Sequence, residues 1–357
     1  SVPIERKEKG RRTCTKSSHP RSSSLNRSLF AALKRIGLLG FPFVKRDAGM
    51  IGDDIEPEEF FSLLEKLMNT PSAPFREHKI REVVLSEVAR RPGVTVKQDE
   101  WGNVLVSCEN DSHGSHCVLC AHMDHPGFVD GEFLGSIHAG YLNADNRVIE
   151  HDNGIGIWDL PAFEKCDQWI RGRACDDLVG CAVALATVFH HTRVRSKCNV
   201  HALLTVAEEV GLLGAALACD TEIIPAGSTV LSLETSPALS EKQFHSGCIV
   251  RVGDRRSVFN PLVTRALIDV AVNHNINHQR RLMDGGSCEG TVFHDAGYQT
   301  GALCVALGNA HNQGPNHSVA MEYVSVSDAT AMLRLAIAAA SSLATAMARH
   351  PLPLKPM

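Results

Sequence analysis

Two adjacent carboxylates, Glu208 and Glu209, stand where an apolar, β-rich run over residues 201–206 ends. The Gly-punctuated, Ala-rich segment 212–219 follows them, and its composition predicts a helix. Neighbouring carboxylates at a strand end point in different directions, so one can bind a metal ion while the other moves a proton. An isolated Glu-Glu pair is also compatible with a solvated acidic loop, so the interpretation depends on partners elsewhere in the chain.

Most of the other candidate groups also lie at the carboxyl ends of predicted strands. His122 directly follows the continuous apolar run 117–121, Glu234 follows the strand predicted over 229–233, and Asp176 precedes an apolar helix. In an open α/β sheet, this edge is where binding sites form. Each residue also has a local alternative, such as a helix cap for Asp176 or a surface position for Glu234. Their joint arrangement favours a common site.

An imidazole from a loop, His317, completes a set of two histidines and three carboxylates, beside the spare carboxylate of Glu208. Two divalent ions need such a set when one carboxylate bridges them. Mixed nitrogen and oxygen ligands with open positions suit catalytic Zn²⁺, with Co²⁺ or Mn²⁺ as alternatives. Asp124, two residues beyond His122, can orient that imidazole through its second ring nitrogen. The Asn-His-Ser context favours His317 over its rivals His125, His294 and His311.

Strands and helices alternate along the body of the chain, which predicts an α/β fold. We expect a three-layer α/β/α architecture around a central, mostly parallel (mixed) sheet. Residues 50–124 and 172–350 would form the catalytic domain. The segment 125–171, rich in Gly, Asn, Asp and aromatic residues, would form a short β-rich insertion.

Charge is distributed unevenly along the 357 residues. Residues 1–49 contain twelve Lys and Arg against three Asp and Glu, a balance of +9, and the remainder carries −13. The acidic body argues against nucleic acid as a partner of the folded part. The basic segment fits a transit peptide, a disordered tail, or a translated upstream extension with Met50 as the working start; we favour disorder or extension.

The twelve cysteines show no small-domain disulfide framework, so we expect free thiols in a reducing, cytoplasmic environment. Cys117 and Cys120 lie within a strand-like run, where core thiols are the simpler interpretation. We find no secretory signal and no apolar run of the length that a membrane span needs. The uncharged stretch 335–348 fits a packed helix.

The motifs together resemble the M42 (glutamyl aminopeptidase, endoglucanase-M-like) family of dinuclear zinc peptidases, within the wider M18/M20/M28/M42 clan. The resemblance covers about residues 56–346 and rests on short segments that occur in the same order. These are Trp101-Gly102-Asn103, the His-Met-Asp-His-Pro-Gly-Phe run at 122–128, the Arg-Ala-Cys-Asp-Asp-Leu-Val-Gly run at 173–180, the Glu-Glu segment 205–215, the Gly-Gly-Ser-Cys-Glu-Gly turn 285–290, and Asn316-His317-Ser318 with Glu322.

The resemblance implies a zinc-peptidase-like fold and a role for each residue. His122 and Glu234 would hold one metal ion, and Glu209 and His317 would hold the other. Asp176 would bridge both ions, with a cis peptide bond to the next residue. Glu208 would act as the general base and then the general acid.

The implied function is an aminopeptidase that cleaves N-terminal residues from peptides. The alternatives are an N-acyl amino acid deacylase or carboxypeptidase-like hydrolase, favoured by Glu234 where the family commonly has Asp, and a non-catalytic metal-binding scaffold. Cys288-Glu289 also departs from the family's small residue plus Asp, so the pocket can differ. The insertion is short for the family, which argues against a twelve-subunit shell but leaves a homo-oligomer open.

Overall fold

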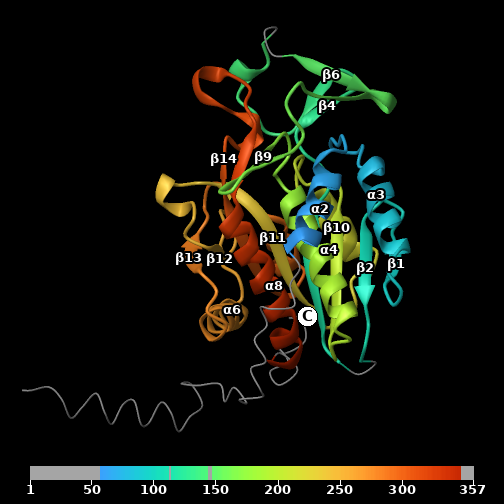
Figure 1. The fold of residues 1–357 in the computed structure, drawn as a ribbon. Coiled ribbons are helices and arrows are strands. Elements are labelled where there is room, and N and C mark those ends of the chain that lie inside the picture. The colour runs from blue at the N-terminus through green and yellow to red at the C-terminus, as the bar shows by residue number, and fades with distance from the viewer. Residues whose placement is uncertain (1–56, 112–113, 144–146, 347–357) are drawn as a thin grey trace, which may run out of the picture. The chain divides into compact units, whose positions relative to one another are not determined.

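The computed structural model describes residues 57–111, 114–143 and 147–346 (Figure 1). The predicted basic extension 1–49 lies outside these residues. Helices and strands alternate through the described part of the chain, as predicted. The strands form an eleven-stranded main sheet and a separate four-stranded sheet.

The main sheet is parallel at its centre, and its outer pairs are antiparallel except for the parallel pair β12–β13. Its longest path runs β1-β2-β10-β3-β11-β14-β15-β9-β8, and β12 pairs with β13 and β14. The four central strands β10, β3, β11 and β14 are mutually parallel. Its strands are β1 Thr95–Gln98, β2 Val104–Cys108, β3 His116–His122, β8 Glu164–Lys165, β9 Trp169–Gly172, β10 Asn199–Thr205, β11 Thr229–Pro237, β12 Cys248–Gly253, β13 His278–Leu282, β14 Gln299–Gly308 and β15 Glu322–Ser325. The prediction of a mixed α/β sheet is confirmed.

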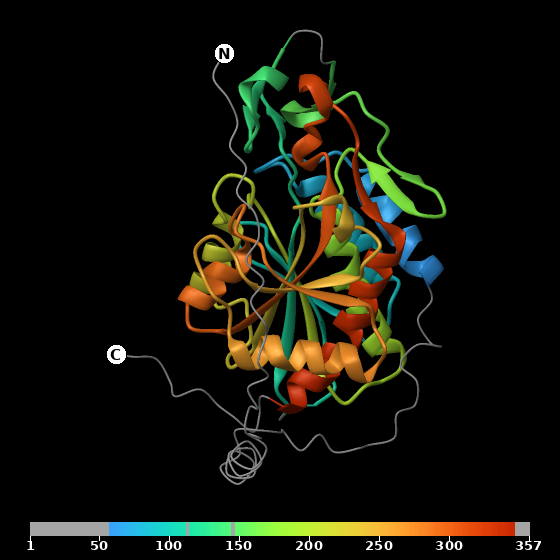
Figure 2. The same cartoon turned by 90° about the vertical axis from the view of Figure 1, so that its left-hand side faces the viewer.

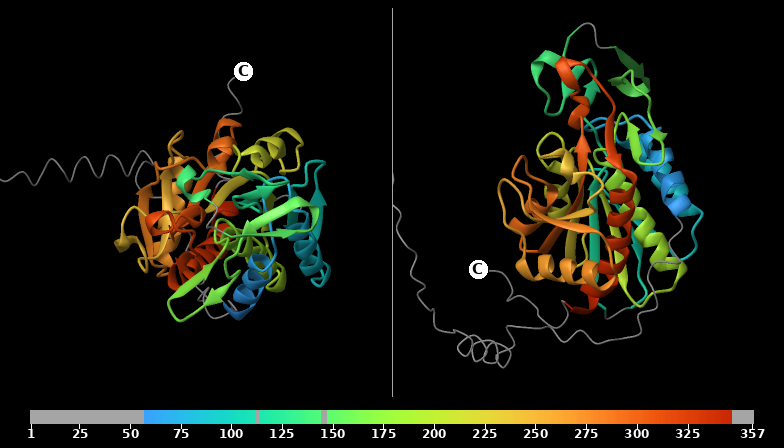
Figure 3. Two further views of the ribbon diagram at one scale, coloured as in Figure 1. Left: turned by 90° about the horizontal axis from the view of Figure 1, so that it is seen from above. Right: turned by 60° about the vertical axis from the view of Figure 1, so that its left-hand side comes forward.

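Helices cover both faces of this sheet (Figures 2 and 3). They are α2 Pro57–Met68, α3 His78–Ala89, α4 Leu178–Arg193, α5 Leu213–Asp220, α6 Pro261–Asn273, α7 Glu289–Asp295 and α8 Val326–Ala346. Short 3₁₀ turns are η1 Ala139–Tyr141, η2 Asp152–Gly154, η3 Glu241–Gln243, η4 Ala310–Asn312 and η5 Pro315–His317. The larger core lies under α2, α3, α4, α6 and α8, and a smaller one lies under α5 and α7.

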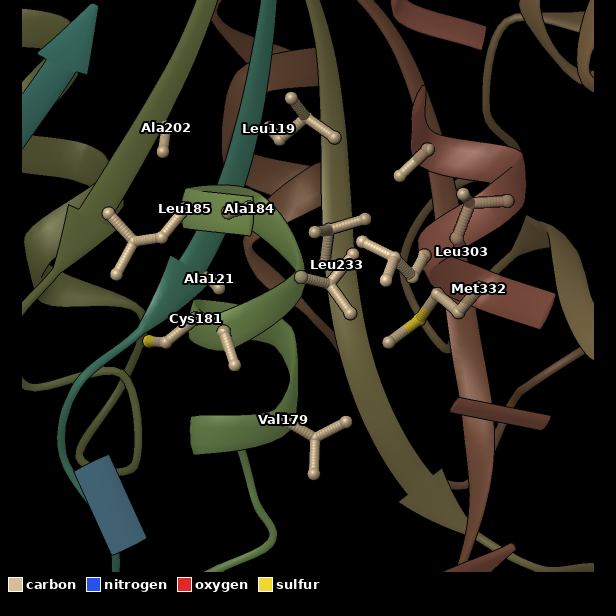
Figure 4. Packing of buried hydrophobic residues seen from close by; sticks show 14 of the residues in the cluster. Leu119, Ala121, Val179, Cys181, Ala184, Leu185, Ala202, Leu233, Leu303 and Met332 are labelled. Atoms are coloured by element: carbon tan, nitrogen blue, oxygen red, sulfur yellow. The ribbon is translucent and has the colours of Figure 1, made fainter. Parts of the chain in front are cut away.

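Strand β3 shows how the two cores form on opposite faces. Leu119 and Ala121 enter the larger core, where they meet side chains of α4 and α8 (Figure 4). Val118 and Cys120 point the other way into the smaller core. Successive side chains of a strand alternate between faces, so a strand buried on both faces must be apolar throughout. This explains the continuous apolar run before His122.

The four-stranded sheet stands at the carboxyl end of β3, at the top of Figure 1. It has the order β5-β4-β7-β6, with β4 Gly127–Val129, β5 Glu132–Leu134, β6 Val148–His151 and β7 Ile155–Trp158. The rings of Phe128, Phe133 and Trp158 pack together within it. The predicted insertion 125–171 also contains β8 and part of β9, and β9 rejoins the main sheet by pairing with β15.

Helix α8 contains an 18-residue window, Val326–Leu343, that is long and apolar enough to cross a membrane by length and composition. Within the fold, 67% of this window is buried, and Met332, Leu335 and Ala336 are fully enclosed in the larger core. These properties are those of a core helix in a folded domain.

Candidate metal centre

Five of the six acidic and histidine groups predicted for the metal ions and the proton transfer meet at the carboxyl ends of the central strands. His122 ends β3, Glu208 and Glu209 follow β10, and Asp176 precedes α4. Glu234 lies within β11, just beyond the last residue that pairs with β3. The ligand atoms of three groups each lie within 4.8 Å of one another: His122, Asp176 and Glu234; His122, Glu208 and Glu209; and Asp176, Glu209 and His311.

Asp176 stands between two imidazoles. Its Oδ1 lies 3.5 Å from His122 Nε2, and its Oδ2 lies 3.6 Å from His311 Nε2. The peptide bond between Asp176 and Asp177 is cis, as the resemblance implied. The Asp177 carboxylate caps helix α4 by accepting a hydrogen bond from the Gly180 N–H at 3.2 Å. Asp176 is therefore free to face the cluster while its neighbour begins the helix.

The second imidazole of the cluster comes from His311, and not from the predicted His317. His311 Nε2 lies 3.2 Å from Glu209 Oε2, whereas His317 is exposed and stacks on the ring of His138. The sequence did contain a signal for this choice. His311 comes three residues after β14 ends at Gly308, so it obeys the same strand-end rule as the other candidates. His317 lies a further six residues along the loop.

Backbone carbonyls fix the orientation of both imidazoles. His122 Nδ1 donates to the carbonyl of Asp124 at 3.0 Å, and His311 Nδ1 donates to the carbonyl of Ser136 at 2.6 Å. An imidazole that donates from Nδ1 presents the lone pair of Nε2 in its neutral form. Both Nε2 atoms face Asp176, which is the arrangement that metal ligation requires.

The carboxylate of Asp124 holds the backbone of the two glutamates. Its Oδ1 accepts the backbone N–H of Glu208 at 3.0 Å, and its Oδ2 accepts that of Glu209 at 3.1 Å. It also lies 3.6 Å from His122 Nδ1, beyond the range of a good hydrogen bond. The predicted role of this carboxylate was to orient the imidazole of His122, but in the structure it holds the backbone of the Glu-Glu pair, and the Asp124 carbonyl accepts from the imidazole.

Two further buried side chains hold the same loop. Asn103 accepts the N–H of Val206 at 3.1 Å and donates to the carbonyl of Gly214 at 3.0 Å, so it closes both ends of the turn. A Cβ at Gly214 would collide with the backbone of Val206, which explains the glycine at this position. Glu77 accepts the N–H of Ala207 at 3.0 Å. Burial raises the pKa of Glu77 to about 7, and the nearby Asp124 adds to the rise.

Glu322 ties the Asp176 segment to the loop that carries His311. One oxygen accepts the N–H groups of Cys175 at 2.8 Å and Asp176 at 3.0 Å, and the other accepts that of His311 at 2.7 Å. Glu322 is fully buried. Since all three partners are donors, both oxygens act as acceptors. The sequence motif included Glu322 but gave it no role, because its partners are backbone groups that no pattern of side chains reveals.

The centre carries more buried negative charge than its two imidazoles can balance. Burial raises the pKa of Glu208 well above its usual range and that of Glu234 to about 8, in both cases against the lowering effect of His122. Burial also raises the pKa of Glu209. Asp176 differs because, although burial raises its pKa, the imidazoles of His122 and His311 together hold it below the usual range. Crowded carboxylates of this kind are stabilised as anions by a bound cation.

Two more observations show that the residues fit divalent ions. In a tetrahedral site with bonds of about 2.0–2.2 Å, the ligand atoms lie roughly 3.3–3.6 Å apart. The separations of 3.5 and 3.6 Å between Asp176 and the two imidazoles match this spacing, and the 3.2 Å between His311 and Glu209 is slightly shorter. Among the described residues, one buried oxygen each of Asp176, Glu209 and Glu234 has no hydrogen-bond partner. Orphaned buried oxygens need an explanation, and coordination of a metal ion is one.

Two further buried charged residues, Glu289 and Arg251, act on Glu234. Glu289, the first residue of α7, accepts from the Cys120 thiol at 3.2 Å, and its charge adds to the raised pKa of Glu234. Arg251 on β12 is 3% exposed, donates to Ser236 at 3.0 Å, and lowers the pKa of Glu234. Their charges act on Glu234 in opposite directions.

The fold and the cluster together define an α/β protein with a candidate metal centre. Comparison with known proteins agrees. The M42 glutamyl aminopeptidase family profile matches residues 155–335. A curated protein of Acetivibrio thermocellus, described as a candidate aminopeptidase, is 23% identical over 341 residues, covering 80% of this chain and 99% of its own length.

Solved structures show the same fold at low sequence identity. A TET aminopeptidase from the marine sediment archaeon Thaumarchaeota archaeon SCGC AB-539-E09 superposes with a TM-score of 0.68 at 18% identity, covering 80% of this chain and 97% of that one. The Pyrococcus horikoshii TET1 peptidase gives a TM-score of 0.65 at 18% identity, covering 79% and 99%. Because the family profile spans half of the sequence, the chain belongs to the M42 glutamyl aminopeptidase family.

Proposed function

We propose that the protein is a metal-dependent aminopeptidase whose centre holds two divalent ions, Zn²⁺ in the first instance, with Co²⁺ or Mn²⁺ as alternatives. The observation that carries the proposal is Asp176, whose two oxygens face the Nε2 atoms of His122 and His311. His122 and Glu234 would hold one ion, Glu209 and His311 the other, and Asp176 would bridge them. Membership of the M42 family supports this assignment, since M42 peptidases are metal-dependent.

When bound, a pair of divalent ions polarises a substrate carbonyl and lowers the pKa of a shared water. Glu208 is the group placed to move the proton. Its Oε2 lies 4.0 Å from His122 Nε2, and its backbone is held by Asp124. Burial, which raises the pKa of Glu208, suits a carboxyl that must take a proton from water and hold it until the leaving amine accepts it.

An aminopeptidase would act on peptides with a free N-terminus. Glu234 favours a second candidate function. In the wider clan, Glu at this position accompanies many carboxypeptidases and deacylases. The buried guanidinium of Arg251 acts on Glu234 and brings a positive charge close to that ligand. An N-acyl amino acid deacylase is therefore the second candidate.

The other proposals are a cytoplasmic location and a homo-oligomeric state. All eleven cysteines in the described residues are free, which supports a reducing environment. The Pyrococcus horikoshii TET1 peptidase is described as assembling into a tetrahedron or a large octahedral shell. By analogy, we infer that this chain also forms a homo-oligomer.

Parallel assays of aminoacyl-p-nitroanilides and N-acyl amino acids test the function. We expect turnover of the first set only, and its loss after dialysis against a chelator. Turnover of N-acyl amino acids alone would show that the protein is a deacylase and not an aminopeptidase. Activity that survives complete metal removal would contradict both.

A further inference from the structure

The loop that carries His311, residues 309–321, contains several non-glycine residues in the left-handed backbone region. His311, Asn312, Asn316 and His317 all adopt left-handed conformations, with φ between 55° and 60°. Non-glycine residues in this region cost free energy and persist only where surrounding contacts impose them. Glu322 supplies one such contact through the His311 N–H, at 2.7 Å. Contacts elsewhere must hold the rest of the loop.

The side chain of Asn312 bonds to His125 and to the carbonyl of Arg173, and further contacts come from the segment between β5 and β6. The Tyr141 hydroxyl donates to the carbonyl of Gly314 at 2.8 Å, and the His138 N–H donates to the side-chain oxygen of Gln313 at 3.2 Å. The carbonyl of Ser136 accepts from His311 Nδ1 itself. The two segments are far apart in sequence but lie side by side at the top of Figure 2 and of the right-hand view in Figure 3.

His317, from the loop, contacts the rings of His138 and Tyr141. Its ring stacks on His138 with centroids 5.1 Å apart and planes 22° apart, and meets the edge of Tyr141 at 5.2 Å. Gly140 lies beneath, where an added Cβ would stand 2.9 Å from His317 Nδ1. We call His138, Tyr141 and His317 the aromatic clasp.

We propose that the aromatic clasp positions His311, so that the affinity for the second metal ion depends on the segment between β5 and β6. The proposal rests on the metal centre of the proposed function. His317 is then a positioning residue that acts through the loop, and not a ligand. In the same segment, the Ser136 carbonyl fixes the orientation of the His311 ring by accepting a hydrogen bond from Nδ1, as partners of ligating histidines commonly do.

The dependence is selective, because the first ion has no ligand in the loop. His122 and Glu234 lie on β3 and β11, in the centre of the main sheet. Releasing the clasp would leave these two residues in place while His311 gained freedom. The free energy of ordering the loop would then be required at the moment the second ion binds, which lowers its affinity alone.

Zinc titration of the metal-free protein against a chromophoric chelator tests the proposal. The variants are His317→Ala, His317→Phe and Tyr141→Phe, with Tyr298→Phe as a matched hydroxyl deletion remote from the loop. We expect the weaker of two zinc affinities to fall roughly tenfold in His317→Ala and Tyr141→Phe, within the range found for partners of ligating histidines. The tighter affinity should stay unchanged. His317→Phe, which keeps an aromatic ring for stacking, and Tyr298→Phe should match the wild type.

Hydrogen exchange of residues 309–321 in the metal-free protein tests the clasp separately from the metals. Faster exchange in His317→Ala and Tyr141→Phe than in the wild type is the expected result, and equal exchange would overturn the clasp. Equal loss of the second ion in His317→Phe and His317→Ala would also overturn it, since His317 would then be a ligand. A wild-type protein that binds fewer than two ions would contradict the proposed function, whatever the exchange result.

Discussion

Two clusters of carboxylates in this protein have opposite charge balance. The first joins α2, α3 and α4, where Glu87 accepts from Lys66 and Arg91, both at 2.9 Å. Glu59 pairs with the same arginine at 3.1 Å and with Arg193 at 2.7 Å. Although burial raises the pKa of both glutamates, their cationic partners outweigh it and hold both pKa values below the usual range.

In the metal centre, by contrast, Glu208, Glu209 and Glu234 have raised pKa values, and three buried oxygens of the centre lack hydrogen-bond partners. Both clusters are made of glutamates held by the fold. The difference is that the chain supplies enough cations to outweigh burial in the first cluster, whereas two imidazoles and the guanidinium of Arg251 do not outweigh it at the glutamates of the second. We conclude that the first cluster serves stability by itself, whereas the second depends on cations from solution.

Among the substitutions that compare the two clusters, Glu208→Gln should have the largest effect, and the effect is on turnover. The amide cannot accept the proton, so turnover should fall by about 10²–10⁴-fold, as for loss of a general base. Metal content should stay the same, because Glu208 is not proposed as a ligand. Steady-state kinetics and metal analysis of the same preparation check both statements. Full activity in this variant would refute the proton-transfer role.

Glu322→Gln should have an intermediate effect. The amide keeps one acceptor oxygen but turns an NH₂ group toward backbone N–H donors, so either the Asp176 segment or His311 loses its tie. We expect zinc affinity to fall by about 10–100-fold, the range for groups that orient ligands. The matched control is Glu87→Gln, the same change at a buried carboxylate of the first cluster, which joins α2, α3 and α4. Equal zinc affinities in the two variants would show that Glu322 does not position the ligands.

Glu87→Gln should have the smallest effect, confined to stability. Glu87 has a side chain only 6% exposed, and Lys66 is 45% exposed, so solvent weakens part of the network. We expect the free energy of unfolding at pH 7 to fall by about 1–2 kcal/mol, with unchanged turnover. The folded-state pKa of Glu87 is lowered, so its contribution is present above the ordinary value of 4.5 and is lost as the pH falls through the folded value.

Urea unfolding of the wild type and the Glu87→Gln variant at several pH values checks this linkage. The difference in free energy of unfolding between them should shrink as the pH falls below about 4.5. A difference that stays constant with pH would show that the charge of Glu87 does not stabilise the fold.

The sequence predicted those parts of the protein that follow from regular periodicity. The apolar run before His122 and the alternation of strands and helices were sufficient for the α/β fold, since a strand buried on both faces must be apolar. Residues at strand ends, such as Asp176 and Glu209, were predicted to meet because parallel strands end at one edge.

The sequence was misleading where loop geometry decides the outcome. His317 stood in a familiar local context, but the left-handed turns of residues 309–317 direct His311 into the centre instead. Strands β12, β13 and β15 were not predicted; four of the five residues of β13 are polar, and β15 is only four residues long. The role of Glu322 escaped prediction because it binds backbone N–H groups, which leave no trace in the pattern of side chains.

The most direct test of the central claim is to count divalent ions bound per chain by elemental analysis after reconstitution and removal of excess metal. Our account predicts two ions in the wild type and in Glu87→Gln, and loss of both in Asp176→Ala, because Asp176 is shared. A wild-type protein with fewer than two ions, or an Asp176→Ala variant that keeps both, would contradict it.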